Sequence, residues 1–174
     1  MSYTQHTTDA AKLIVGCAIV TVSDSRAEAT DSSGAAIKAL LAAEGHTLCD
    51  YKIIPNDPEK LDHHLGTLLG RPDLGVILIH GGTGISHRDQ TIDVVSRRLE
   101  LVLPGFGELF RMLSWDQIGS GAMLSRAIAG VSRRRGESPK LLFSMPGSTK
   151  AVELAMTKLI LPELRHLLSE LRKA

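Results

Sequence analysis

The 174-residue chain has few aromatic side chains and almost no net charge. Phe, Trp and Tyr make up only 3% of its residues, so the aromatic platforms on which single-stranded nucleic acids stack are scarce. Its 20 basic and 19 acidic side chains leave a formal net charge of +1, which gives no general attraction to nucleic acid or to a membrane surface. We therefore expect no nucleic acid and no membrane as partners, and any anion site must be local.

Cysteine and long apolar runs are also scarce. The two cysteines, Cys17 and Cys49, have a spacing that matches no zinc site, so we expect free and buried thiols. No stretch reaches the roughly 18 apolar residues of a membrane helix, and residues 1–12 lack the pattern of a secretory signal. These absences predict a cytoplasmic protein with residues 1–12 as a flexible tail and residues 13–174 as a single domain.

Strand patterns alternate with helical patterns along the chain. Apolar or alternating segments predict strands at residues 13–22, 46–54, 75–80 and 140–145. Helices are predicted between residues 31–33 and Gly45, from 58 to 69, from 91 to 99, around 107–114 and 122–129, and from 149 onward with a kink or break at Pro162. This order implies an α/β fold in which helices cover both sides of a largely parallel sheet.

The most informative segment is residues 76–89, where an apolar run stops at three glycines within four residues and a carboxylate follows. Gly81, Gly82 and Gly84 would let backbone N–H groups approach an anion, which predicts a phosphate-binding turn before the next helix. The turn has neither the Gly-Lys-Ser/Thr of a Walker motif nor the glycine order of a dinucleotide fingerprint. The alternative is a tight strand-to-helix connection in which Asp89 merely caps the helix.

Polar residues also follow the other strands of the predicted parallel sheet. The carboxyl ends of parallel strands share one edge, and ligands bind in the crevice there. We therefore expect four segments to form one candidate site, namely Ser23-Asp24, Asn56-Asp57, the glycine loop with Asp89, and Pro146-Gly147-Ser148.

The residue types at this edge favour magnesium and phosphate chemistry. Carboxylates and hydroxyls without paired cysteines suit Mg²⁺ bound to substrate phosphates, with Asp89 and either Asp57 or Asp24 as its carboxylates. Phosphoryl or nucleotidyl transfer needs mainly positioning and charge neutralisation, which such a site can supply. A serine hydrolase built from Ser23, His80 and Asp24 is disfavoured because the chain has no Gly-x-Ser-x-Gly elbow.

Five motifs stand in one order along the chain. They are Thr21-Val-Ser-Asp-Ser-Arg26, the run from Gly81 to Thr91 (Gly-Gly-Thr-Gly-Ile-Ser-His-Arg-Asp-Gln-Thr), Pro104-Gly-Phe-Gly-Glu108, Leu124-Ser-Arg-Ala127 and Met145-Pro-Gly-Ser-Thr-Lys150. Together they resemble the MoaB/MogA family of molybdenum cofactor biosynthesis proteins over roughly residues 13–165. The stretch from 105 to 127 is more similar to the MoaB branch than to MogA.

The resemblance implies a three-layer α/β/α domain with a mostly parallel central sheet that binds the pterin dithiolene molybdopterin. It implies a homotrimer, which in the MoaB branch often pairs into a hexamer, and a molybdenum-insertion protein as a partner. The implied reaction is adenylylation. The terminal phosphate of molybdopterin would attack the α-phosphorus of magnesium ATP, releasing pyrophosphate and leaving adenylylated molybdopterin.

The same resemblance assigns residues to this reaction. Asp89 would be the essential carboxylate that organises magnesium or the transition state, and the turn would hold phosphate through Gly81, Gly82, Thr83 and Gly84. The rest of the pocket would be lined by Ser23, Asp24, Ser33, Gly34, Ser125, Pro146, Gly147 and Ser148.

The chain departs from the family pattern after its second strand. The family often shows an acidic pair after Pro, whereas here Asn56 follows Pro55 and the acid comes one position later, at Asp57. If the first position must bind magnesium, Asn supplies a neutral oxygen and weakens the site, and if a shift by one residue is tolerated, Asp57 can serve. The substitution keeps open a second function, a pterin-binding or scaffold protein that does not catalyse adenylylation. A nucleotide-binding protein unrelated to pterins is the third.

Overall fold

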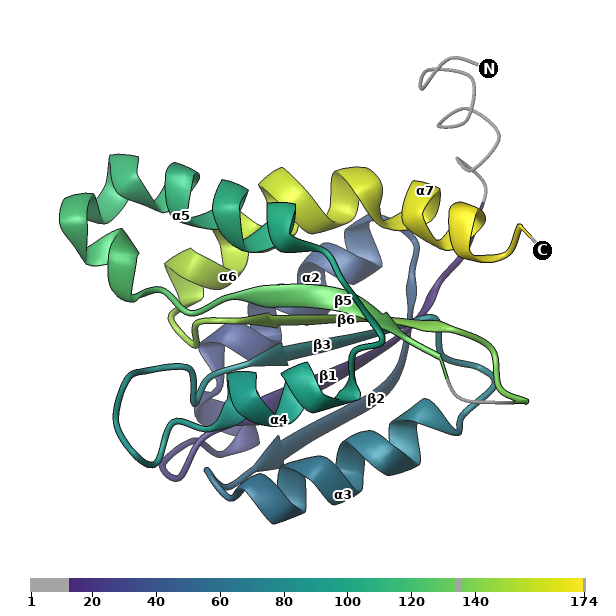
Figure 1. Cartoon of the computed structure of the whole chain (residues 1–174), viewed down its shortest axis with the longest axis horizontal. Coiled ribbons are helices and arrows are strands. Elements are labelled where there is room, and N and C mark those ends of the chain that lie inside the picture. The colour runs from purple at the N-terminus through teal and green to yellow at the C-terminus, as the bar shows by residue number, and fades with distance from the viewer. Residues whose placement is uncertain (1–12, 134–135, 174) are drawn as a thin grey trace.

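The computed structural model describes residues 13–133 and 136–173, which form a six-stranded sheet with helices on both faces (Figure 1). The tail expected at residues 1–12 lies outside the described residues. The strand order is β2-β1-β3-β6-β5-β4. The strands are β1 (Gly16–Val22), β2 (Thr47–Ile54), β3 (Val76–His80), β4 (Leu101–Val102), β5 (Ile128–Ser132) and β6 (Lys140–Met145). Strands β2, β1, β3 and β6 run parallel, while β5 is antiparallel to β6 and to β4.

The helices make the two outer layers. They are α2 (Ser32–Ala43), α3 (Pro58–Leu69), α4 (Thr91–Arg98), α5 (Pro104–Ile118), α6 (Thr149–Ala155) and α7 (Leu161–Leu171). Helices α2, α5, α6 and α7 pack on one face of the sheet, and α3 and α4 pack on the other. The expected three-layer α/β/α fold with a mostly parallel sheet is confirmed.

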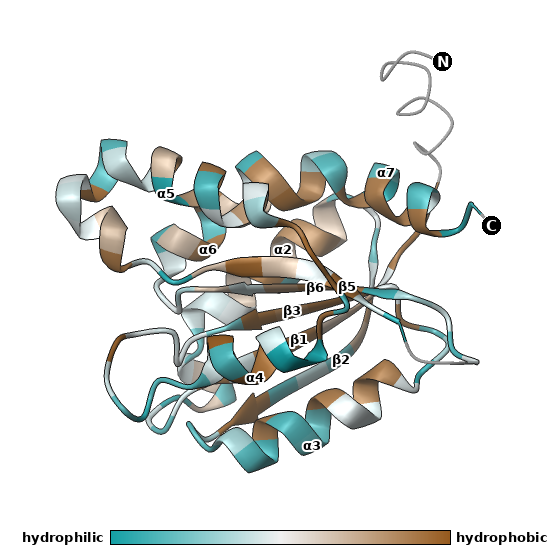
Figure 2. Cartoon of the chain, viewed as in Figure 1, coloured by the Kyte–Doolittle hydropathy of each residue, from teal (hydrophilic) through white to brown (hydrophobic). Residues whose placement is uncertain are grey.

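Two apolar clusters, one on each face of the sheet, hold the layers together. Because side chains alternate along a strand, Leu78 of β3 packs toward α2, α5 and α6, whereas Ile77 and Ile79 pack toward α3 and α4. All three are fully buried. Figure 2 shows hydrophobic residues along the central strands and hydrophilic ones on the outward side of α3. Burial on both faces explains why the central strands form nearly continuous apolar runs.

Several helices begin, end or are interrupted at the capping, proline and glycine residues that the sequence contains. The Asp31 side chain accepts from the Gly34 N–H and caps α2, and Pro58 stands in the first turn of α3. Gly45, just after α2, has φ +72°, a conformation that favours glycine. The last helix is interrupted by a π-helical turn at Met156–Ile160, directly before Pro162 in the first turn of α7. The kink or break expected at Pro162 corresponds to this π-helical turn, which ends before α7 begins, and Pro162 itself lies within the α-helix.

The segment between α4 and β6 differs from expectation. The helix predicted at 122–129 is wrong, because a 3-10 turn, η2 (Gly119–Leu124), is followed by strand β5. Strand β4 was not predicted either. A Cβ at Gly130 in the middle of β5 would lie 2.3 Å from the Leu101 carbonyl oxygen, so this glycine permits the close approach of β4.

Both cysteines lie in the described part of the chain. In the described part of the chain both cysteines are free thiols, with Cys17 buried and Cys49 only half-buried.

Arg165 of α7 donates to the Leu13 carbonyl at 3.2 Å, so the start and the end of the described chain lie together at the amino ends of the parallel strands (Figure 1). Among the residues described, no helix combines the length and the apolar character needed to cross a membrane.

Candidate functional site

The loops that follow the four parallel strands meet at one edge of the sheet. The Ser23 N–H donates to the Ile54 carbonyl at 2.9 Å, and the Asn56 N–H donates to Oδ1 of Asp24 at 2.9 Å. The Gly81 N–H donates to the Met145 carbonyl at 3.2 Å. These bonds join the loops after β1, β2, β3 and β6, as the parallel arrangement of the strands requires.

Each glycine of the turn after β3 makes room for a specific neighbour. Gly81 has φ +88°, and a Cβ there would lie 2.3 Å from the Val22 carbonyl oxygen. Gly82 has φ +60°, and a Cβ there would lie 2.4 Å from Oγ1 of Thr91. A Cβ at Gly84 would lie 2.6 Å from Oδ2 of Asp89. The glycines are therefore required by close packing around the loop as well as by backbone conformation.

Asp89 faces back into the loop. Its Oδ2 accepts from the Ser86 hydroxyl at 2.6 Å and from the Ser86 N–H at 3.3 Å, and its Oδ1 accepts from Nδ2 of Asn56 at 3.4 Å. The Ser86 side-chain hydrogen bond is the main reason that the pKa of Asp89 lies below its ordinary value. The N-cap of α4 is Gln90. The interpretation of Asp89 as a mere helix cap is therefore wrong.

Asn56 and Asp57 have separate surroundings. Whereas Asn56 bonds to Asp89, the Asp57 carboxylate caps α3, accepting from the Glu59 and Lys60 N–H groups at 3.0 and 3.1 Å. The Lys60 N–H bond is the main reason that the pKa of Asp57 is lowered. The structure therefore brings Asn56 beside Asp89 and turns Asp57 toward its own helix.

Across the sheet edge from the glycine loop, α5 and α6 form a groove with a volume of about 770 Å³. Its lining includes Ser125, Pro146 and Ser148 of the predicted pocket. Beside it, the Ser33 hydroxyl donates to the Gly147 carbonyl at 2.8 Å, which ties α2 to the loop after β6. The expected pocket-lining residues from these segments therefore lie near one another.

A buried polar network lies beneath the glycine loop. Oδ2 of Asp31 accepts from the Thr21 hydroxyl at 2.6 Å and from the Tyr51 hydroxyl at 2.8 Å, and its Oδ1 accepts from the Gly34 N–H at 2.9 Å. Burial alone would raise the pKa of the Asp31 carboxyl, but these three donors outweigh it and lower that pKa. From the sequence, residues 31–33 are predicted only as the start of a helix, and Tyr51 only as part of a strand.

His80, the last residue of β3, joins the same network. Its Nε2 lies 2.9 Å from Oγ1 of Thr21. Since the single hydroxyl proton of Thr21 goes to Asp31, Nε2 of His80 must carry a proton and donate it to Thr21. Burial lowers the pKa of His80 to about 4. A hydrolase that uses His80 with Ser23 is not supported, because Nε2 of His80 is occupied by Thr21 and the Ser23 hydroxyl accepts from the N–H groups of its own loop.

The neutral state of His80 predicts a pH-dependent stability. The folded-state pKa of about 4 lies below the ordinary 6.5, so the unfolded chain binds this proton first as the pH falls. The resulting stability is fully present above pH 6.5 and is lost as the pH falls toward 4, by an amount on the order of 3 kcal/mol. Between pH 6.5 and 4, we expect the free energy of unfolding to fall less in His80→Gln than in the wild type. Urea unfolding at several pH values measures this difference.

The matched control for this experiment is His63→Gln, because His63 lies exposed on α3. That variant should follow the wild-type pH dependence. Parallel curves for the wild type and His80→Gln between pH 6.5 and 4 would show that His80 takes up its proton equally well in the folded chain.

The oxygen donors at the edge fit a magnesium ion that arrives with phosphates. They are the Asp89 carboxylate, the Asn56 amide and the Thr91 hydroxyl, whose buried Oγ1 has no hydrogen-bond partner among the described residues. Within residues 13–133 and 136–173, no three His, Cys, Asp or Glu side chains cluster as a metal site. One carboxylate with neutral oxygens suits Mg²⁺ that keeps substrate and water ligands better than it suits a closed protein cage.

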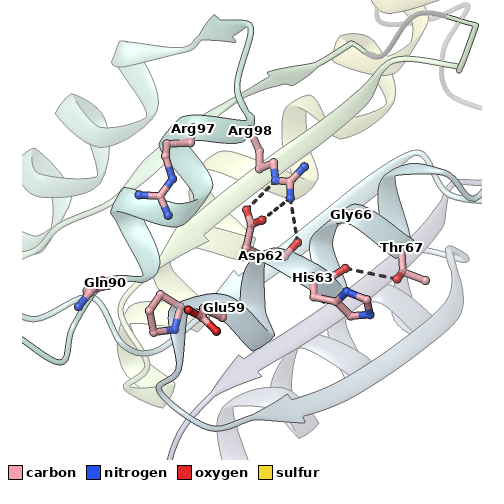
Figure 3. Close-up of a pocket in the computed structure, with 9 residues that line it drawn as sticks. Glu59, Asp62, His63, Gly66, Thr67, Gln90, Arg97 and Arg98 are labelled. Atoms are coloured by element: carbon pink, nitrogen blue, oxygen red, sulfur yellow. Dashed lines mark hydrogen bonds and ion pairs between the residues drawn. The ribbon is translucent and has the colours of Figure 1, made fainter.

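A second depression, of about 720 Å³, lies between α3 and α4 (Figure 3). Asp62 and Arg98 face each other in it, and Nε of Arg98 donates to Oδ1 of Asp62 at 2.8 Å. Its acidic lining residues, Glu59 and Asp62, offset its two arginines, Arg97 and Arg98, so it offers no concentrated charge to an anion. The sequence motifs that form the candidate site are centred elsewhere and not on this depression.

Comparison with known proteins gives a consistent result. Residues 18–166 match a family model described as "Probable molybdopterin binding domain". The chain is 49% identical over 174 residues to Molybdenum cofactor biosynthesis protein B of Halalkalibacterium halodurans, covering 99% of both chains. A crystal structure of Molybdenum cofactor biosynthesis protein B aligns with a TM-score of 0.87 at 48% identity, covering 93% of this chain and 98% of the other. The tungsten cofactor synthesizing protein MoaB from Pyrococcus furiosus aligns with a TM-score of 0.82 at 32% identity, covering 92% and 98%.

Proposed function

Because the chain belongs to this molybdopterin-binding domain family of molybdenum cofactor biosynthesis proteins, we propose that it transfers an adenylyl group from ATP to molybdopterin. The observation that carries the proposal is the position of Asp89. Its carboxylate lies beside Asn56, at the end of a glycine loop and at the edge where the loops after four parallel strands meet. Ligand sites of open α/β sheets lie at this edge.

The glycine loop offers two backbone N–H groups to a phosphate. The Gly81 N–H already donates to Met145, and the Gly84 N–H interacts with the Asp89 carboxylate. Among the described residues, the N–H groups of Gly82 and Thr83 make no hydrogen bond. In the proposal these two N–H groups bind a nucleotide phosphate, while Gly81 forms the turn and Gly84 supports Asp89.

The pterin occupies the α5–α6 groove in this proposal. Its volume of about 770 Å³ lies within the range of small-molecule sites, and Ser125, Pro146 and Ser148 line it. The groove adjoins the loop after β6, whose Met145 carbonyl accepts from Gly81. A molybdopterin phosphate directed toward the glycine loop would then meet the α-phosphate of ATP.

The reaction is an in-line displacement. An oxygen of the molybdopterin phosphate forms a bond to the α-phosphorus of ATP, and the bond from that phosphorus to the bridging oxygen of pyrophosphate breaks. If magnesium binds, the Asp89 carboxylate and the Asn56 amide oxygen would hold it, and it would supply positive charge to the phosphates. The protein contributes the position of Asp89 and the two N–H groups of the turn, and so aligns the reacting phosphates.

A second candidate function is favoured by Asn56. The side chain that contacts Asp89 is a neutral amide, so Asp89 is the carboxylate at this point and Asp57 is engaged in capping α3. A site with one carboxylate could bind molybdopterin and deliver it to a molybdenum-insertion protein without adenylylation. The two functions share the groove and differ only in turnover.

The two functions are distinguished by pyrophosphate release from the purified protein with molybdopterin, ATP and Mg²⁺. We expect release that stops when any one of the three is left out. Binding of molybdopterin, followed by quenching of intrinsic fluorescence or by equilibrium dialysis, is measured in parallel. Tight binding without any pyrophosphate would contradict the transferase and support the binding protein.

We also propose a homotrimer or a hexamer. Helix α5 and the η2 turn that packs against it expose several large apolar side chains. Trp115 is 60% exposed and Met123 is 79% exposed. Neighbouring exposed residues are Leu109, Met112, Ile118 and Leu124. Contiguous exposed apolar surface of this kind is typical of a protein–protein contact, and a second copy of the chain would cover it.

A further inference from the structure

The carboxylate that the proposed reaction needs stands at the end of an exposed loop. Residues 84–88 are all exposed, and the Ile85 side chain is 75% exposed. Loops with few buried apolar contacts open locally at low free energy. Because phosphoryl transfer depends on positioning, this loop needs an anchor from outside itself.

Besides the Asn56–Asp89 hydrogen bond and the Arg88–Asp24 ion pair, Arg126, from a distant part of the chain, contacts the backbone at both ends of the loop. Nη1 of Arg126 donates to the Gly84 carbonyl at 3.2 Å and to the Asp89 carbonyl at 3.2 Å. Nη2 of Arg126 donates to Oδ2 of Asp93 in the first turn of α4 at 2.9 Å. One guanidinium therefore joins both ends of the loop to the helix that follows it. Arg126 itself belongs to the segment between η2 and β5, across the edge of the site.

The chemistry of this contact requires arginine. The planar guanidinium presents donors in a fixed fork, so one nitrogen can serve two carbonyls while the other serves a carboxylate. A lysine ammonium has one nitrogen and cannot span the same three acceptors in that geometry. The Arg126 contacts are made to main-chain carbonyls and to Asp93, while the side chain of Asp89 is left to Ser86 and Asn56.

We infer that Arg126 is a positioning residue that holds the 84–89 loop closed and thereby fixes the Asp89 carboxylate for adenylyl transfer. The inference rests on the proposed function for its catalytic part. Its structural part, the closed loop, stands independently. Ser125, the neighbour of Arg126, lines the α5–α6 groove, so one short segment contacts both sides of the site.

The first test needs no activity. Arg88 lies in the loop with its side chain 78% exposed, so trypsin can cleave after it when the loop opens. We expect Arg126→Ala to release the 1–88 fragment about tenfold faster than the wild type, as measured by mass spectrometry of the digest over time. The control is Arg98→Ala, since Arg98 has a similar exposure (27% against 30% for Arg126) and also pairs with an aspartate, but in the α3–α4 depression (Figure 3). Equal cleavage at Arg88 in the wild type and in Arg126→Ala would overturn the inference.

The second test measures the kinetics of the proposed reaction. We expect Arg126→Ala to lower kcat for pyrophosphate release about 100-fold with a much smaller change in KM for ATP, and added guanidinium to restore part of kcat. Arg98→Ala should keep the wild-type kcat. Should Arg126→Ala fold poorly, Asp93→Asn removes the negative charge that pairs with the guanidinium and should give a smaller change in the same direction. An open loop with unchanged kcat would overturn the positioning role.

The two tests separate the inference from the proposed function. If the wild type releases no pyrophosphate but Arg126→Ala still exposes Arg88, the adenylyl transfer is refuted and the closed loop stands. If the wild type is active and the loop of Arg126→Ala stays closed, the proposed function stands and Arg126 has no positioning role.

Discussion

Replacing Asp89 by Ala should lower pyrophosphate release by roughly 10²–10³-fold while molybdopterin binding is retained. The side chain is half-buried and accepts hydrogen bonds from the Ser86 hydroxyl, the Ser86 N–H and the Asn56 amide, in addition to its interaction with the Gly84 N–H. Its removal takes away the carboxylate at the point where the loops converge, without touching the α5–α6 groove. The measurement is single-turnover pyrophosphate release at saturating ATP, with molybdopterin affinity determined alongside. A variant that turns over at the wild-type rate would remove Asp89 from the mechanism.

The neighbouring positions supply the controls for this experiment. Asp57→Asn should leave the rate unchanged, because asparagine also caps a helix well and the Asp57 carboxylate is occupied by the Glu59 and Lys60 N–H groups. Asn56→Asp would set a second carboxylate beside Asp89 and is expected to raise the magnesium-dependent rate. A collapse of the rate in Asp57→Asn, with no change in Asn56→Asp, would assign the metal to Asp57 instead.

Replacing Gly81 by Ala should destabilise the fold by roughly 3 kcal/mol and abolish ligand binding at the glycine loop. Its φ of +88° is strained for any L side chain, and the added Cβ would lie 2.3 Å from the Val22 carbonyl oxygen. That oxygen belongs to the backbone at the end of β1, so relief requires the loop to move away from the sheet. The measurement is the free energy of unfolding in urea together with ATP binding.

A second glycine separates the two causes of this loss. Gly45 has φ +72°, yet a Cβ there would meet no atom of the described chain within 4 Å. Gly45→Ala should therefore cost only the backbone strain, roughly 1 kcal/mol, and leave ligand binding unchanged. Equal losses in the two variants would mean that the contact with Val22 relaxes easily and that conformation alone makes Gly81 necessary.

Much of this fold can be predicted from the sequence because the parallel strands are buried on both faces. Strand β6 was predicted with the bounds that the structure has, and α3 begins at Pro58 as expected. Strand β5 was missed because Ile-Ala-Gly-Val-Ser is short and weakly apolar, and its pairing with β4 depends on the close approach at Gly130. Such contacts depend on tertiary structure and leave no periodic signal.

The candidate site also has some features that could be predicted from the sequence and others that could not. The convergence of the loops after the strands follows from parallel topology, so the positions of Asp24 and Asn56 near the glycine turn could be predicted. The choice between Asn56 and Asp57 could not, because it depends on which of two adjacent residues becomes the N-cap of α3. Arg126 lies within a motif, but its role could not be predicted from the sequence, because its three acceptors lie 33 to 42 residues away along the chain.

The contact between Arg165 and Leu13 has a practical consequence for handling the molecule. Both ends of the described chain lie on the side of the sheet away from the loops (Figure 1). An affinity label, a fluorophore or an attachment to a sensor chip introduced at either end would therefore leave the mouth of the groove open to diffusing small molecules. The contact between Leu13 and Arg165 also makes the described part of the chain suitable for circular permutation, with a linker between residues 173 and 13 and a new opening in an exposed connection remote from residues 81–93.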